Sequence, residues 1–228
     1  MILEFEKFSA SCVCCSEQIS KYYGSCNEIT SSLSSNIYIL QGEIDCGGWA
    51  FVSAFSKQCK EKQLFSNSKV LYNGKSLSKK EIESLAYYID GKLNIYTKNC
   101  FFKASIERLL KKNRFPASFD DIIKLFRVPD YVLNRPLKYC GVYRSVYQAI
   151  VGLIKGNRVF TTRWYGEYGF DSSAIIPMIE ALRAYNCILL IPSSKKNNFG
   201  ENCVYIDIND WFSIPIQKKY RDDHGNVQ

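Results

Sequence analysis

Apolar and polar residues alternate at the start of the chain, and further along they give way to short runs that are apolar throughout. Residues 2–12 (ILEFEKFSASC) alternate, as expected for a strand with one buried face. Residues 37–40 (IYIL) and 187–191 (CILLI) are continuously apolar, which is typical of strands in the middle of a parallel sheet. Residues 16–36 are polar and rich in turn-forming residues, which predicts a connecting segment there.

Helical and strand patterns alternate through the rest of the chain. The first predicted helix has one face formed by Trp49, Val52, Phe55 and Cys59. It is followed by a strand at 70–72, a hairpin turn at Asn73 and Gly74, and a capped helix and strand at 76–89. The later predicted elements are mainly helices at 93–140 with Ser118 as a cap, a helix at 144–156, a strand at 158–162, a helix at 171–185 despite Pro177, and strands at 187–191 and 203–210. From residue 145 the order is helix, strand, helix, strand, strand. This order favours an α/β fold with a largely parallel core.

The composition is that of a globular protein of 228 residues, with 46% hydrophobic and 23% charged residues. The net charge of +8 is spread out, without a block of five like charges, so we expect most of it to form a solvated face. A phosphate-rich partner or an anionic membrane surface stays open, but we do not favour nucleic acid as a partner. No run approaches the length of a membrane span. Residues 1–10 (MILEFEKFSA) contain acidic residues and no apolar core of signal length, so we expect no secretory signal.

Ten cysteines are present, and with no secretory signal we expect reduced thiols in a bacterial cytoplasm. Cys12, Cys14, Cys15 and Cys26 form a cluster that could in principle bind zinc. The cluster lacks paired C-x-x-C knuckles, and the only histidine, His224, lies in a polar tail. Small buried cysteines are therefore the favoured interpretation, and we predict no metal site.

A glycine loop between a strand and a helix is the first candidate site. Gly42, Gly47 and Gly48 follow the apolar run 37–40, in the place of a phosphate-binding loop G-x-x-x-x-G-K-[ST]. The lysine and hydroxyl positions of that motif hold Gly48 and Trp49. Backbone N–H groups of residues 47–49 could still cradle a phosphate, since they use no side chain. Alternatively, Trp49 fills the vacated space and the loop is a packing element; both interpretations stay open.

In order, these elements resemble the ATPase domain of ATP-binding-cassette (ABC) transporters over nearly the whole chain. That family has a strand entering a glycine loop, a β-hairpin similar to residues 70–82 (VLYNGKSLSKKEI), and a helical subdomain that ends in a Leu-Ser-Gly-Gly signature. The resemblance implies a single ABC-ATPase-like domain over residues 1–228. It would combine a mostly parallel sheet, an antiparallel β subdomain and a helical subdomain at about residues 93–155.

Two further segments carry the resemblance. Residues 137–160 (LKYCGVYRSVYQAIVGLIKGNRVF) lie at the signature position, where Cys140 stands for serine, Gly141 matches the first glycine and Arg144 matches a common arginine. Residues 168–171 (YGFD) resemble the Gly-Leu-Asp turn of the family, through Gly169 and Asp171.

The functional groups of the family are replaced in most places. The replacements are Gly48 for lysine, Trp49 for the hydroxyl residue, Val142 for the second signature glycine, Arg163 and Trp164 for the magnesium-binding and catalytic carboxylates, and residues 192–194 (PSS) for the switch histidine. Hydrolysis of a nucleoside triphosphate needs cations against the developing charge and a group that orients water. We therefore expect negligible hydrolysis and assign no catalytic residue, although the ATPase-like pattern leaves open whether the chain is an enzyme.

The leading hypothesis is a degenerate ABC-type ATP-binding domain that lacks hydrolysis and acts as a partner subunit. The resemblance implies pairing with another ABC-type ATPase subunit or with a second copy, or docking to a membrane subunit on another chain, in the cytoplasm at the inner face of the membrane. No cofactor is certain, and ATP or ADP is the ligand that the resemblance implies. The alternatives are an active, atypical NTPase that uses Arg163, Lys75 or Glu167, and a basic scaffold that binds nucleic acid.

Overall fold

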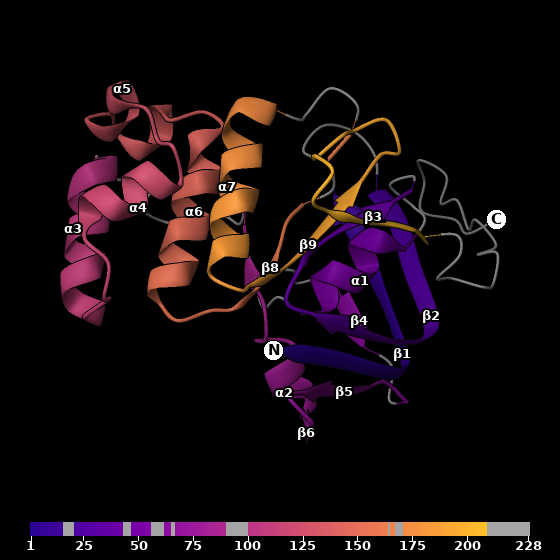
Figure 1. Ribbon diagram of the computed structural model, residues 1–228. Helices are drawn as coiled ribbons and strands as arrows, with labels where there is room; N and C mark the ends of the chain where they lie inside the picture. The colour runs from indigo at the N-terminus through magenta and orange to yellow at the C-terminus, as the bar shows by residue number, and fades with distance from the viewer. Residues whose placement is uncertain are drawn as a thin grey trace.

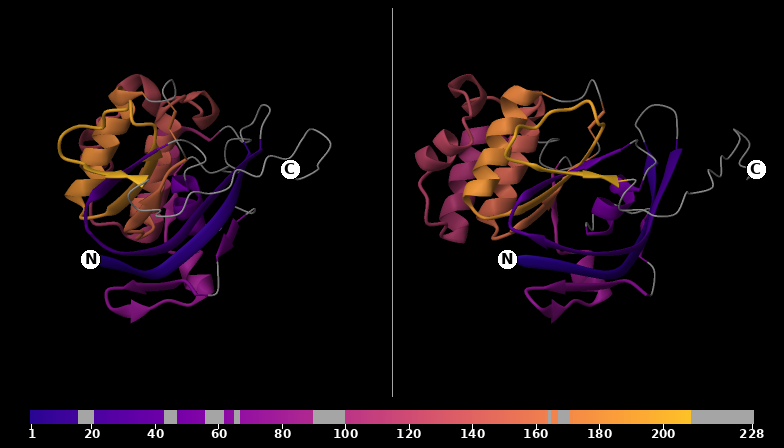
Figure 2. Two further views of the ribbon diagram at one scale, coloured as in Figure 1. Left: turned by 90° about the vertical axis from the view of Figure 1, so that its right-hand side faces the viewer. Right: turned by 45° about the vertical axis from the view of Figure 1, so that its right-hand side comes forward.

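The computed structural model places an antiparallel sheet, a parallel sheet and a group of helices side by side (Figure 1). It describes residues 1–15, 21–42, 47–55, 62–64, 67–89, 100–163, 165–166 and 171–208. The two further views show the parallel sheet between the helices and the antiparallel strands (Figure 2). The predicted α/β class, with a parallel core, an antiparallel β part and a helical part, is confirmed.

The antiparallel sheet has the order β2-β1-β5-β6, with β4 also paired to β1. Its strands are β1 (Ile2–Cys15), β2 (Lys21–Ser34), β4 (Lys62–Leu64), β5 (Lys69–Tyr72) and β6 (Lys75–Ser76). The prediction of a connecting segment at residues 16–36 was wrong for residues 21–34, which form the long strand β2; residues 16–20 lie outside the described residues. The β1–β2 register shifts between Phe5 and Ala10, and Lys7 and Glu28 near that shift have φ angles of 48° and 52°. This bulge interrupts the two-residue alternation that would have indicated a strand.

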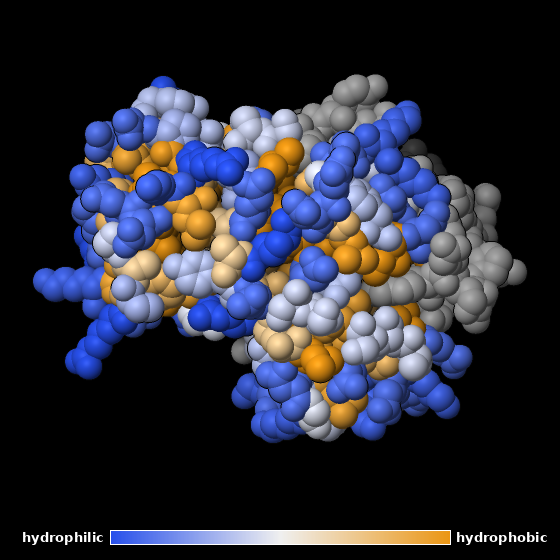
Figure 3. Space-filling view, viewed as in Figure 1, coloured by the Kyte–Doolittle hydropathy of each residue, from blue (hydrophilic) through white to orange (hydrophobic). Residues whose placement is uncertain are grey.

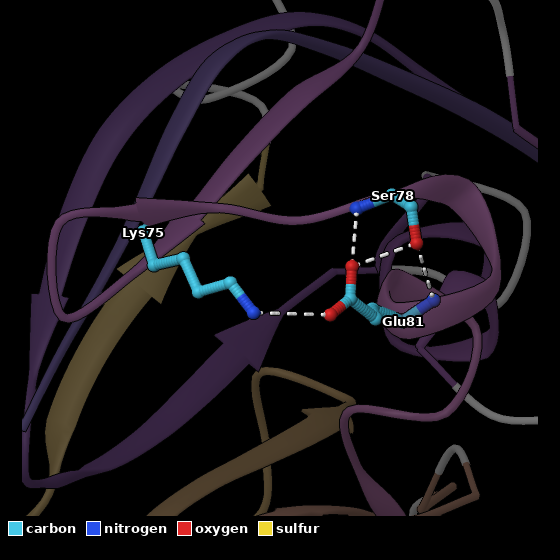
Figure 4. A network of polar contacts seen from close by, with 3 residues as sticks. All are labelled: Lys75, Ser78 and Glu81. Carbon is cyan, nitrogen blue, oxygen red and sulfur yellow. Dashed lines mark hydrogen bonds and ion pairs between the residues drawn. The ribbon is translucent and has the colours of Figure 1, made fainter.

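Local signals set the β5–β6 hairpin and the helix after it. Asn73 and Gly74 both have positive φ angles, as a type I′ turn requires. Helix α2 (Lys79–Ile82) begins at Ser78, whose hydroxyl accepts a hydrogen bond from the Glu81 N–H, while the Glu81 carboxylate accepts from Ser78 and from Lys75 (Figure 4). These contacts confirm the predicted turn and the predicted cap.

The parallel sheet has the order β10-β3-β9-β8-β7, and all its strands run in the same direction. They are β3 (Ile37–Gln41), β7 (Tyr87–Tyr88), β8 (Val159–Thr161), β9 (Ile188–Ser193) and β10 (Val204–Asp207). Helix α1 (Gly48–Ala54) follows β3 and packs against β1, β2 and β9. It ends earlier than the predicted helix, whose Cys59 lies outside the described residues.

The parallel sheet separates two hydrophobic cores. In β3, Ile37 and Ile39 belong to the core on the helical side, whereas Tyr38 and Leu40 belong to the core on the side of α1 and the antiparallel sheet. Successive residues of β9 divide between the same two cores. Burial on both faces explains why these strands are apolar throughout, and it confirms their predicted central position.

Helices cover the other face of the parallel sheet (Figure 1). They are α3 (Phe102–Asn113), α4 (Phe119–Leu125), α5 (Asp130–Leu133), the short 3-10 helix η2 (Leu137–Tyr139), α6 (Tyr143–Ile154) and α7 (Ser172–Ala184). Ser118 caps α4 by accepting a hydrogen bond from the Asp121 N–H, as predicted. Of the predicted helical subdomain, residues 93–99 lie outside the described residues. No helix within the described ranges is long and apolar enough to cross a membrane.

Candidate functional site

The parallel strands end together at one edge of their sheet. Gln41 of β3 is in register with Ser193 of β9 on one side and with Asp207 of β10 on the other. Ligands of open parallel sheets bind outside the carboxyl ends of the strands, so the segments that follow these strands form the candidate site. We call it the carboxyl edge; it comprises residues 41–42, 47–49, 161–163, 165–166, 193–197 and 207–208.

The glycine loop meets a side chain from the far end of the chain. Gly47 has a φ angle of 89° and its carbonyl accepts the first helical hydrogen bond, from Phe51 at 2.9 Å. A Cβ atom on Gly48 would lie only 2.5 Å from Cδ1 of Ile208, a residue that follows β10 and is buried. The space where a side chain at position 48 would begin is therefore taken by Ile208. Trp49 is half-buried, and residues 43–46 lie outside the described residues.

The residues after β8 offer hydroxyls and a cation. The hydroxyl of Thr161 is buried without a hydrogen-bond partner, and that of Thr162 donates to the carbonyl of Arg163 at 2.9 Å. The Arg163 guanidinium lies 5.7 Å from the centroid of the Tyr165 ring. Trp164 and Glu167 lie outside the described residues. Within the described ranges, no group of three or more His, Cys, Asp or Glu side chains could hold a metal ion.

The end of β9 and the residues after it form a buried polar network. The Asn197 side-chain amide donates to the carbonyls of Tyr165 and Gly166, both at 3.0 Å, and to the Ser193 hydroxyl at 2.9 Å. The Ser193 hydroxyl in turn donates to the Tyr165 carbonyl at 3.2 Å. Ser193 and Asn197 are buried. This network joins the segments after β8 and β9, and none of its side chains titrates near neutral pH.

The charges at the carboxyl edge suit an anion better than a metal cation. Arg163, Lys195 and Lys196 are exposed there, and Asp207, the one carboxylate among the described residues of the edge, forms an ion pair with Lys195. The side chain of Gln41 donates to the Lys195 carbonyl at 3.5 Å, which ties the end of β3 to the same segment. Three cations against one carboxylate leave this edge positive among the described residues.

The signature-like residues lie apart from the glycine loop, at the start of α6. Cys140 is buried, its thiol lies 3.5 Å from the Pro136 carbonyl, and burial raises the pKa of the thiol. Gly141 has a φ angle of 54°, and its carbonyl accepts a hydrogen bond from Arg144 Nε at 3.2 Å. A raised pKa makes Cys140 a poor nucleophile at neutral pH.

Asp171 lies next to this segment, because α6 and α7 pack side by side. Its carboxylate caps α7 by accepting hydrogen bonds from the Ser173 N–H at 3.0 Å and the Ser173 hydroxyl at 2.6 Å. Burial raises the pKa of the Tyr143 phenol on α6, and the nearby Asp171 carboxylate raises it further. The fold thus brings the signature-like segment and Asp171 together, while Gly169 lies outside the described residues.

Two residues that shape the carboxyl edge were not identified from the sequence. Ile208 belongs to a predicted alternating strand, and nothing in that pattern indicates a contact with Gly48, which is 160 residues away. Asn197 lies in a polar segment that carries no recognisable motif. Both act through contacts between segments that are distant in the sequence.

Several solved structures have a fold similar to that of this chain. A Pyrococcus furiosus protein assigned as an ATP-binding protein of an ABC transporter is 13% identical, with a TM-score of 0.61; the alignment covers 93% of this chain and all of that one. The chain has the fold of an ABC-transporter ATP-binding domain. The cbiO1 protein from Clostridium perfringens, part of the ABC transporter complex cbiONQ, shares this ABC-ATPase fold at 12% identity and a TM-score of 0.54, over 85% of this chain and 78% of its own.

A third structure with the ABC-ATPase fold is the ADP conformation of an ATP-binding cassette of an ABC transporter. It is 11% identical with a TM-score of 0.56, and the alignment covers 92% of this chain and 84% of that chain. No protein-family model and no curated protein matches the sequence. At these identities the likeness concerns the ABC-ATPase fold and not the chemistry of the carboxyl edge.

Proposed function

We propose that this chain is a hydrolysis-deficient ABC-type ATPase domain that acts as the partner subunit of another ATPase domain. The observation that carries the proposal is the contact between Gly48 and Ile208, because it fills the place where the lysine of a phosphate-binding loop would begin. A lysine there holds the β- and γ-phosphates during phosphoryl transfer. A side chain at position 48 would begin 2.5 Å from the buried side chain of Ile208.

Other residues at or near the carboxyl edge also support the absence of hydrolysis. Arg163 and Trp164 follow residues 159–162 in the sequence, in place of the carboxylates that hold magnesium and activate water. The Ser193–Asn197 network contains no general base. Because removal of one preorganised electrostatic group typically costs about 10²–10³ in rate, loss of all of them leaves no measurable hydrolysis.

A partner role is supported by the surface around the signature-like segment. The exposed apolar or aromatic side chains of this surface are Tyr131, Tyr139 and Val142, at 60%, 62% and 39% exposure. Two of the aromatic rings carry a cation over their face, Arg135 over Tyr131 at 5.1 Å and Lys138 over Tyr139 at 4.8 Å. Aromatic residues and arginine are enriched where protein surfaces bind one another. In ABC ATPases, to which the sequence has a resemblance, this segment faces the glycine loop of the second domain.

Nucleotide binding without hydrolysis is compatible with the same edge. Backbone N–H groups of residues 47–49, together with the Arg163 and Lys195 side chains, would hold the phosphates of ATP or ADP. These groups of the chain would contact the phosphates directly, without a metal ion between them. The domain would then work in the cytoplasm, at the inner face of a membrane if its partner assembly includes a membrane subunit.

Phosphate release and thermal unfolding test the absence of hydrolysis. The purified protein should release no phosphate from ATP with Mg²⁺. Any stabilisation by ATP should be equal in Mg²⁺ and in EDTA, and a hundredfold excess over Kd would add roughly 2.7 kcal/mol. Arg163→Gln should reduce it, whereas Lys111→Gln, which removes one exposed charge on α3, should not. Magnesium-dependent release that is lost in Arg163→Gln would instead support the atypical NTPase.

Sedimentation tests the partner role. If copies of this chain pair through the signature-like surface, Val142→Asp should abolish concentration-dependent association. Val204→Asp is a matched control, because Val204 is 38% exposed and lies on β10 rather than on that surface. A monomer at all concentrations, with and without ATP, would rule out a homodimer and leave a different ATPase chain as the partner to be sought. Equal effects of the two substitutions on association would contradict pairing through the signature-like surface.

The alternatives fare differently. Lys75 pairs with Glu81 at 3.4 Å on the β6 edge of the antiparallel sheet, at the far end of the molecule from β3, so it does not replace the missing lysine (Figures 1 and 4). Arg163 does lie at the carboxyl edge, so the hypothesis of an atypical NTPase can be tested with the Arg163→Gln variant. A nucleic-acid scaffold would show affinity that falls linearly with salt on logarithmic axes, and the absence of binding to DNA and RNA would remove that hypothesis.

A further inference from the structure

A hollow lies at the opposite, amino edge of the parallel sheet. It has a volume of about 240 Å³ and lies between the end of β5 and the turn that links α6 to β8. Asn157 and Arg158 line it and precede β8, whereas Thr162 follows β8, so the hollow is separate from the carboxyl edge. The outline of the molecule is indented where the helices meet the antiparallel sheet (Figure 3).

Two cations line this hollow, and neither has a counterion among the described residues. Lys155 is exposed, and its Nζ lies 5.9 Å from the centroid of the Tyr87 ring. Arg158 is half-buried, and its guanidinium donates to the carbonyl of Asn157 at 3.0 Å. In the part of the chain that the structure describes, no carboxylate lies within ion-pair distance of either cation. The polar end of the hollow is therefore positively charged.

Three groups whose pKa values the Arg158 charge affects are neutral at pH 7. They are the phenols of Tyr72 and Tyr185 and the thiol of Cys187, and burial raises the pKa of each one, that of Cys187 to about 11. None of them supplies a negative charge. A half-buried guanidinium loses hydration, and a charge held in this way is normally compensated by a partner.

The backbone holds these cations in place. The N–H of Asn157 donates to the Gly152 carbonyl at 3.0 Å, and the N–H of Ile188 donates to the Arg158 carbonyl at 2.9 Å. Gly156 has a φ angle of 88°, which closes α6 and turns the chain toward β8. Arg158 is thus anchored to β9 as well as to α6. A site whose backbone is fixed before the ligand arrives loses less freedom on binding.

We propose that this hollow binds the phosphate group of a small phosphate monoester. A phosphate monoester carries a charge of about −1.5 to −2 at pH 7, which matches the two charges of Arg158 and Lys155 better than a single carboxylate would. Leu85 and Val159 line the same hollow and provide an apolar wall for the organic part of the molecule. Asn157 lines the hollow beside the two cations as well.

Isothermal titration with inorganic phosphate and with phenyl phosphate tests this site, in sodium chloride that keeps the ionic strength constant. Arg158→Gln keeps a hydrogen-bonding group and removes the charge, and we expect it to weaken binding at least about tenfold. Lys155→Gln should weaken it too, and this exposed residue can change without loss of the fold. Lys111→Gln and Arg163→Gln serve as controls, the second because it lies at the carboxyl edge.

The outcomes separate this proposal from the proposed function. Binding that is lost in Arg158→Gln or Lys155→Gln and kept in Arg163→Gln supports the hollow, and tighter binding of phenyl phosphate identifies an organic monoester rather than free phosphate as the ligand. Binding that is lost only in Arg163→Gln would place the anion at the carboxyl edge and overturn the proposal. Absence of binding by both probes would overturn it as well, without bearing on hydrolysis or pairing.

Discussion

The contact between Gly48 and Ile208 can be tested by a pair of substitutions that add and remove the atoms concerned. Gly48→Ala adds a Cβ that would lie 2.5 Å from Cδ1 of Ile208, and Ile208→Val removes that same Cδ1 atom. Carbon atoms in contact normally lie about 3.5–4.0 Å apart, so the single alanine substitution forces a displacement of about 1 Å. Ile208 is buried, which leaves its side chain little room to move.

The expected free energies of unfolding follow from these distances. Overpacking at a buried site costs about 1–3 kcal/mol, and an alanine in place of glycine returns at most about 1 kcal/mol through helix propensity. We therefore expect Gly48→Ala to destabilise by about 1–2 kcal/mol and Ile208→Val by about 0.5–1.5 kcal/mol. In the double variant the next atoms, Pro192 Cβ at 3.5 Å and Ile208 Cγ1 at 3.6 Å, are in ordinary contact with the new Cβ. The alanine should then cost almost nothing.

Urea unfolding of the wild type, the two single variants and the double variant measures this coupling. We expect the double variant to be more stable than the sum of the single effects by about 1–2 kcal/mol, within the range found for residues in contact. Additive effects would show that Ile208 does not occupy the space at position 48. That result would also remove the main argument against a side chain in the phosphate-binding position of the loop.

Three further predictions concern other parts of the molecule. A Cβ on Gly152 would lie 2.6 Å from Phe160 Cε1, so Gly152→Ala should lower the urea midpoint despite better helix propensity. Hydrogen bonds from Ser78 hold the pKa of Glu81 at about 2. Because this pKa is lowered, the contribution of the ionised Glu81 to stability is complete above pH 4.5 and is lost as the pH falls through about 2. An NMR titration of Ser78→Ala should show the pKa of Glu81 rising. Burial raises the pKa of the Cys26 thiol to about 12, so thiol reagents at pH 8 should modify Cys26 only after unfolding, and fast labelling of native protein would contradict that burial.

Much of the secondary structure could be predicted because its signals lie within a few residues. Asn73 and Gly74 tolerate the positive φ angles of a tight hairpin turn, and Ser78 and Ser118 place a hydroxyl where a helix start needs one. The apolar run at residues 37–40 marks a strand that is buried on both faces. These local agreements, in their order along the chain, were sufficient to indicate the ABC-ATPase fold.

Strand β2 could not be predicted because its pattern depends on its partner. Its buried residues Cys26, Ile29 and Leu33 do not alternate evenly, since the bulge near Glu28 shifts the register against β1. Serine, threonine and asparagine side chains along it suggest turns when the pairing with β1 is not known. A strand of this kind is stabilised by its pairing partner more than by its own composition.

The sequence alone determined where the candidate loop lies: Gly42, Gly47 and Gly48 mark it, and Gly48 and Trp49 directly follow Gly47. Only the tertiary structure decided which side chains surround it, because Ile208 reaches Gly48 and Asn197 reaches Tyr165 from segments that are distant in the chain. It also brought Arg158 and Lys155 to one hollow beside β5. Local conformation follows from short-range sterics and hydrogen bonds, whereas burial and charge at a site depend on which distant residues the packed sheets bring together.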